Sequence, residues 1–99
     1  MLYHVSFIFK LRPEDYTGFF ERLDALGRWV QPFDGCVLVS TALTAEGLRA
    51  KLLPYLGELD KLVISKMFRG QCAGRLPGRY KTFIKGAISR DPSAPEQPS

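Results

Sequence analysis

Six basic side chains in the C-terminal third of the chain have the type and spacing needed to contact phosphate groups. They are Lys66, Arg69, Arg75, Arg79, Lys81 and Lys85. Residues 61–90 hold eight basic residues and no acidic one, whereas residues 1–60 hold six basic and eight acidic residues. Because clustered cations attract phosphate over long range and in a salt-dependent way, this segment predicts contact with the backbone of RNA or DNA. An acidic protein partner is the alternative.

Glycines interrupt this basic segment at every fourth residue, at Gly70, Gly74 and Gly78. The spacing matches neither the phosphate-binding loop G-x-x-x-x-G-K-[S/T] nor the dinucleotide-binding pattern G-x-G-x-x-G. We therefore interpret the glycines as parts of a flexible connection, in which they supply backbone angles that other residues avoid.

The residues after this connection, RYKTFI (79–84), alternate as a fifth, edge strand. The alternation predicts Arg79, Lys81 and Lys85 on one face, with Phe83 among them as a stacking surface for a base. The competing interpretation is a solvated edge whose lysines oppose aggregation.

Other reactive residue types are too few or too scattered to predict catalysis. His4 is the only histidine, and Cys36 and Cys72 are the only cysteines, so the chain lacks the ligands of a zinc site and the base of a catalytic triad. Two isolated cysteines are typical of a reducing compartment. We therefore predict no catalytic residue, no metal and no cofactor.

The elements that would position these residues follow from hydrophobic periodicity and turn signals. Predicted strands cover 2–11, 28–33, 36–43, 61–68 and 79–84, and predicted helices run from Pro13 to Leu26 and from Thr44 to Leu56. Asp34-Gly35 predicts a hairpin turn, Thr44 a helix cap and Pro54 a shortened last turn.

The order of these elements predicts an α+β, ferredoxin-like β-α-β-β-α-β sandwich with an extra C-terminal edge strand. A chain of 99 residues is the length of one domain, which we place at 1–88, followed by a disordered tail at 89–99 that is rich in proline and serine. Apolar stretches of strand length and the absence of a basic N-terminal region predict a cytoplasmic protein that does not enter a membrane.

Residues 15–67 resemble the small "SinR family" proteins, which are related to the CRISPR-associated adaptation nuclease and the VapD-type toxins. The motifs that match in order are Leu26-Gly27-Arg28-Trp29, Val37-Leu38-Val39, Leu43-Thr44-Ala45-Glu46, Leu48-Arg49 and Leu53-Pro54-Tyr55-Leu56. Asp60-Lys61-Leu62-Val63 and Ala73-Gly74-Arg75-Leu76 resemble the next strand entry and loop. The resemblance implies a homodimer, and an open sheet edge that needs protection favours one independently.

One departure from this group affects the expected activity. Its nucleases carry an aspartate at the end of the first strand that binds a divalent metal, whereas this chain has Phe9 and Lys10 there. Glu14 or Asp15 could replace that aspartate. Three functions follow: a non-catalytic nucleic-acid-associated protein, a dimeric structural or interaction module of a toxin–antitoxin-like or adaptation-like system, and a Mg²⁺-dependent endoribonuclease with relocated carboxylates.

Overall fold

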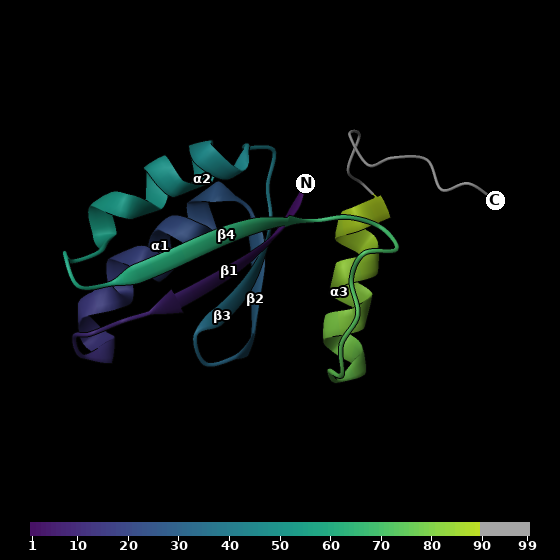
Figure 1. Cartoon of the computed structure of the whole chain (residues 1–99), viewed down its shortest axis with the longest axis horizontal. Coiled ribbons are helices and arrows are strands. Elements are labelled where there is room, and N and C mark those ends of the chain that lie inside the picture. The colour runs from purple at the N-terminus through teal and green to yellow at the C-terminus, as the bar shows by residue number, and fades with distance from the viewer. Residues whose placement is uncertain (90–99) are drawn as a thin grey trace.

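The computed structural model describes residues 1–89, which form a four-stranded antiparallel sheet and three α-helices. The elements in chain order are β1 (Leu2–Ile8), the 3-10 helix η1 (Pro13–Tyr16), α1 (Thr17–Leu26), β2 (Arg28–Phe33), β3 (Cys36–Ser40), α2 (Ala45–Leu52), the 3-10 helix η2 (Leu53–Tyr55), β4 (Lys61–Met67) and α3 (Gly78–Ser89). The predicted mixed α+β class is confirmed (Figure 1).

The strands lie side by side in the order β2-β3-β1-β4. The central strand β1 pairs with β3 on one side, where Leu2 lies opposite Ser40. On its other side it pairs with β4, where Leu2 lies opposite Met67. Strand β2 is an edge strand, as its proline predicts, and its pairing with β3 shifts register between Val30 and Phe33, around Pro32. Asp34-Gly35 forms the predicted hairpin turn, with Gly35 at a φ of 79°.

Helices α1 and α2 cover one face of the sheet, which we call the first face (Figure 1). Alternate residues of β1 and β3 point toward these helices and are fully buried. The core consists of Tyr3, Val5, Phe7, Val37 and Val39 from the strands, Tyr16, Phe19 and Leu23 from η1 and α1, and Leu48 and Leu52 from α2. The helical periodicity that predicted α1 and α2 therefore arises from burial on this face.

The predicted start of α2 at Thr44 is confirmed, whereas its α-helical turns end at Leu52 and not at Leu56. The Thr44 hydroxyl accepts a hydrogen bond from the backbone N–H of Gly47 at 3.0 Å, which satisfies one of the unpaired donors of the helix start. At the other end, Pro54 lies in η2, so the α-helical turns stop at Leu52.

The predicted fifth strand at 79–84 is wrong, because these residues belong to the helix α3. Six residues are too few to separate a two-residue period from a helical one. The longer segment settles the question, since Tyr80, Ala87 and Ile88 are buried and Phe83 and Ile84 are half-buried along one helical stripe. The extra C-terminal edge strand is therefore replaced by a third helix.

Helix α3 packs on the second face of the sheet, opposite α1 and α2. Its Ala87 and Ile88 form a second apolar cluster with Leu2, Cys36 and Leu38, which alternate with the residues of the first core. The helix stands at one end of the sheet in Figure 1 and leaves the remainder of the second face uncovered.

Three large apolar side chains lie on this uncovered part of the second face. Ile8, Phe33 and Val63 are 53%, 57% and 62% exposed. The register places Phe33 and Val63 at opposite ends of one row across the strands, with Cys36 and Ser6 between them, and places Ile8 in the next row, diagonal to Val63. We call these three residues the open patch.

Two sequence predictions concern the remainder of the chain. The predicted disordered tail lies outside the described residues from residue 90 onward. Among residues 1–89, no helix has both the length and the apolar character required to cross a bilayer.

Substitution of Gly27 tests the contact between the end of α1 and β3. A Cβ atom at this position would lie 2.1 Å from the backbone oxygen of Ser40, so Gly27→Ala must displace the backbone. We expect a loss of about 2–3 kcal/mol in the free energy of unfolding, measured by urea denaturation. Gly74→Ala is the matched control, because a Cβ there meets nothing within 4 Å. Equal stability of the two variants would contradict this account.

Candidate nucleic-acid interface

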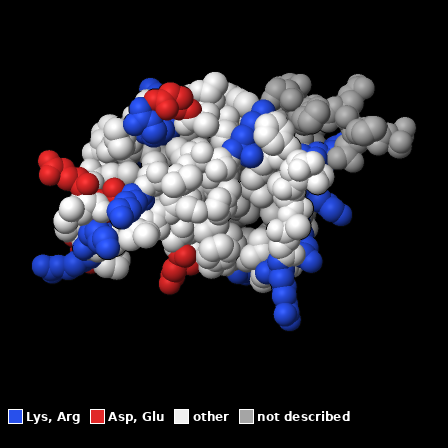
Figure 2. Space-filling model, in the orientation of Figure 1, with Lys and Arg blue, Asp and Glu red and all other residues white. Residues whose placement is uncertain are grey.

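The six basic residues predicted to contact nucleic acid lie in three parts of the structure. Lys66 belongs to β4, Arg69 and Arg75 to the connection between β4 and α3, and Arg79, Lys81 and Lys85 to α3. Figure 2 shows blue side chains over α3 and its connection, with the red side chains of this view over other elements. Residues 61–89 contain seven basic residues and no acidic one.

The helical geometry of α3 changes how its three cations are grouped. Lys81 and Lys85 are four residues apart and lie on the same side of the helix. Arg79 and Lys81 are two residues apart, about 200° around the helix axis, so the single row expected of a strand does not exist. Arg79 instead points toward β2.

The side chain of Arg79 is held in place by Tyr80. Its guanidinium lies 4.6 Å from the centre of the Tyr80 ring, and Nη2 donates a hydrogen bond to the Tyr80 hydroxyl at 2.7 Å. That hydroxyl donates in turn to the backbone oxygen of Gln31 at 3.4 Å, a long contact that connects α3 with β2. The guanidinium is therefore oriented before any ligand arrives.

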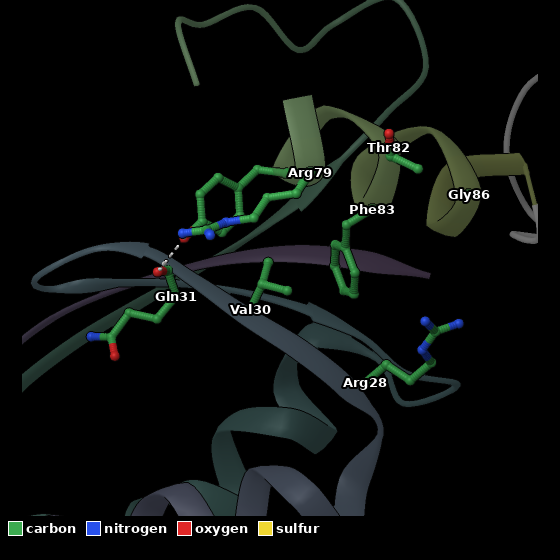
Figure 3. Close-up of a pocket in the computed structure, with 8 residues that line it drawn as sticks. Arg28, Val30, Gln31, Arg79, Thr82, Phe83 and Gly86 are labelled. Carbon is green, nitrogen blue, oxygen red and sulfur yellow. Dashed lines mark hydrogen bonds between the residues drawn. The ribbon is translucent and has the colours of Figure 1, made fainter. Parts of the chain in front are cut away.

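A groove of about 560 Å³ runs between β2 and α3. It is lined by Arg28, Val30 and Gln31 of β2 and by Arg79, Tyr80, Thr82, Phe83 and Gly86 of α3. In Figure 3, Val30 and Phe83 point into the space between the two elements, and Arg28 and Arg79 lie toward its opposite ends. The groove thus combines an apolar floor with a cation at each end.

Sequence reasoning missed Arg28 as a member of this site. The only available signal was the alternation of β2, which places Arg28 and Val30 on the face opposite Trp29. Trp29 itself packs on the first core, with its ring 5.4 Å from that of Phe20. Nothing in the sequence indicated that α3 would cover that other face of β2.

Lys66 lies away from this groove. It pairs with Tyr3 across the sheet and so belongs to the first face, where its Nζ lies 5.0 Å from the centre of the Phe68 ring. Arg69 and Arg75 are exposed on the connection. The structure therefore groups Arg79 with Arg28, groups Lys81 with Lys85, and separates Lys66 from both pairs.

The end of β1 holds aromatic packing where the nucleases of the resembling group carry a metal-binding aspartate. The Phe9 ring stacks on Tyr16, with ring centres 3.8 Å apart and planes at 9°. Glu14 pairs with Arg12 at 3.8 Å, and Asp15 accepts the Arg12 backbone N–H at 3.2 Å. Within residues 1–89, no three side chains of the metal-binding types come together.

Asp60 is the carboxylate nearest this strand end, and its oxygens hold two loops together. Oδ1 accepts hydrogen bonds from the Tyr16 hydroxyl at 2.6 Å and from the Lys10 backbone N–H at 2.8 Å, and Oδ2 accepts the Gly57 N–H at 2.7 Å. Burial opposes ionisation of Asp60, but these hydrogen bonds outweigh it and hold the pKa of the carboxyl below its ordinary value. Asp60 therefore has a structural role.

Neither cysteine has the surroundings of a reactive thiol. Cys36 is buried in the second cluster, and burial raises the pKa of its thiol. Cys72 is half-buried, its Sγ donates to the Phe68 oxygen at 3.3 Å, and burial likewise raises the pKa of the thiol. Because a reactive cysteine needs an accessible thiolate, both residues fit a structural role.

No family model, no curated protein and no solved structure matches the chain.

Replacement of Asp60 by Asn tests the structural role of this carboxylate. A folded-state pKa below the unfolded value of about 3.9 means that Asp60 stabilises the fold above that pH and loses this contribution as pH falls through the folded-state pKa. We expect the free energy of unfolding, measured by urea denaturation between about pH 5 and pH 2, to fall less steeply in Asp60→Asn than in the original chain.

Asp34→Asn, in the turn between β2 and β3, is the control because it removes a carboxylate outside this cluster. A slope that changes equally in both variants would contradict the role assigned to Asp60.

Proposed function

We propose that this protein binds the phosphate backbone of nucleic acid without cleaving it, through α3 and the connection that precedes it. The observation that carries the proposal is the charge of residues 61–89, which hold seven cations and no acid. Three of those cations lie within the twelve residues of α3. A helix of this charge, docked on the outside of a sheet, offers an attractive surface to a polyanion.

The proposal assigns binding, because the carboxylates near the end of β1 make contacts within their own loops and are not directed at one common site. Glu14, Asp15 and Asp60 all accept hydrogen bonds or pair with a cation close to their own loops. Binding to nucleic acid also agrees with the cytoplasmic location predicted from the sequence.

The strand order supports the ferredoxin-like interpretation, which is the architecture that the resemblance to the SinR-type group implies. The strand order β2-β3-β1-β4 places β1 and β3 in the centre, and each of the two helices α1 and α2 connects strands that are separated by one neighbour. We propose this relationship as the origin of the domain, with α3 as its addition.

Removal of two cations from α3 tests the proposal. We expect Lys81→Ala/Lys85→Ala to weaken binding to a mixed-sequence RNA about 10-fold at low salt, measured by fluorescence anisotropy, and to reduce the slope of log K against log salt by about 1–2. Lys10→Ala/Lys51→Ala is the control, because it removes the same charge from exposed positions outside α3 and its connection. This variant should change neither the affinity for RNA nor the salt slope.

Three results would count against this function. Absence of binding at low salt would exclude it, and tighter binding to polyglutamate than to RNA or DNA would favour an acidic protein partner. Mg²⁺-dependent cleavage that is lost in Glu14→Ala or Asp15→Ala would instead support the ribonuclease with relocated carboxylates.

We also propose that the protein forms a homodimer through the uncovered part of the second face. The open patch of Ile8, Phe33 and Val63 supports this, because all three are large apolar side chains exposed on one uncovered face of the sheet, where a partner could bury them. A second copy of the chain would present the same apolar surface and bury both patches in one symmetric contact.

Val63→Glu tests the dimer. The charge would lie inside the proposed contact, on the edge strand β4, so we expect the mass measured by light scattering after size-exclusion chromatography to fall from that of a dimer to that of a monomer. Leu59→Glu is the control, because Leu59 is 74% exposed in the turn before β4 and lies outside the open patch. A monomeric mass for the original chain would exclude the proposal.

A further inference from the structure

We propose that the groove between β2 and α3 seats one unpaired base of a single-stranded nucleic acid, with the flanking phosphates held by Arg28 and Arg79. The inference rests on the proposed function and specifies its ligand. Positive charge alone attracts any polyanion. This groove has in addition an apolar middle between two cationic ends, an arrangement that favours single-stranded nucleic acid as the ligand.

The floor of the groove is suited to a flat, weakly polar ring. Val30 and Phe83 face each other across the space between β2 and α3 (Figure 3). Phe83 is half-buried, because one part of its side chain packs on the second cluster while another part lines the groove. An aromatic ring that is fixed from behind and open in front is the arrangement on which single-stranded nucleic acids stack their bases.

The ends of the groove are suited to phosphate. The Arg79 guanidinium uses one of its five donors on the Tyr80 hydroxyl and stays oriented by the Tyr80 ring, so its other donors remain for a ligand. Arg28 lies three residues before Gln31, about 10 Å along the strand, and thus at the far end from Arg79. A nucleic-acid strand that crosses the groove would therefore meet one guanidinium on each side of the bound base.

Polar groups at the rim could contact the base edges. The backbone oxygen of Gln31, which accepts from the Tyr80 hydroxyl, lies at the rim, whereas the Gln31 side chain points away from α3 (Figure 3). The Thr82 hydroxyl donates to the Gly78 oxygen at 3.1 Å and keeps its acceptor capacity. Two acceptors at the rim are too few to distinguish the bases, which suits binding with little sequence preference.

The groove discriminates against a duplex. Its volume of about 560 Å³ lies in the range of small-molecule pockets and suits one nucleotide unit. Bases inside a duplex are stacked on both sides and paired at their edges, so none can reach Phe83 without being extruded. A duplex would therefore contact only the surface cations, such as Lys81 and Lys85.

Three oligonucleotides of equal length separate base binding from phosphate binding: a 12-mer of deoxythymidine, the same backbone without bases, and a mixed-sequence duplex. Fluorescence anisotropy with the full chain should give an affinity for the single strand about 10-fold above that for the abasic strand, and a comparable margin over the duplex.

Variants of the groove should remove this margin in distinguishable ways. Phe83→Leu keeps an apolar side chain but loses the ring, so we expect binding of the single strand to fall to the abasic level while abasic binding stays unchanged. Arg28→Gln should weaken both strands and reduce the salt slope by about 1. Phe20→Leu, which makes the same change at a half-buried helical residue of the first face and outside the groove, should have no effect.

The outcomes separate this inference from the function on which it rests. Equal affinity for the single strand and the abasic strand, or unchanged binding in Arg28→Gln, would overturn the base site while leaving phosphate contact in place. No binding of any oligonucleotide at low salt would overturn both. If Phe83→Leu does not fold, as judged by circular dichroism, the exposed Arg28 and the comparison of the three oligonucleotides still decide the question.

Discussion

The docking of α3 on the second face of the sheet is the contact on which the candidate site depends. Ala87 and Ile88 bury apolar surface against Leu2 and Leu38, and this burial opposes the entropic cost of ordering a helix that carries three cations. Once the helix is held there, Tyr80 reaches the backbone of β2 and fixes Arg79 at the groove end. Without this docking, the basic segment would be a charged chain end with no defined surface.

Local signals predicted the half of the fold that covers the first face, and they failed where distant residues decide the conformation. The Thr44 cap, the Asp34-Gly35 turn and the break at Pro54 each depend on residues close in sequence, and each is confirmed. The segment 79–84 fits a strand when viewed alone. Its helix becomes apparent only when Ala87 and Ile88 are included, because they complete the buried stripe.

The same limit applies to the candidate site. The charge of the C-terminal third was readable from composition, because it does not depend on conformation. The partner of that charge, Arg28, comes from a strand far away in the sequence, and only the docking of α3 brings the two together. Conversely, Asp60 has the residue type of a metal ligand, yet its oxygens are occupied in holding the loops around Tyr16. Residue type suggests chemistry, and packing determines whether it is available.

Pro32 gives the two edges of the sheet different capacities for growth. A strand can be added only where backbone N–H and C=O groups remain unpaired, and β2 lacks a donor at Pro32 and is irregular around it. Strand β4, which is regular from Lys61 to Met67, has no such interruption. Extension of the sheet is therefore directed to the β4 side, where two copies joined edge to edge form a closed pair and cannot polymerise, and the mouth of the groove beside β2 stays clear in such a pair.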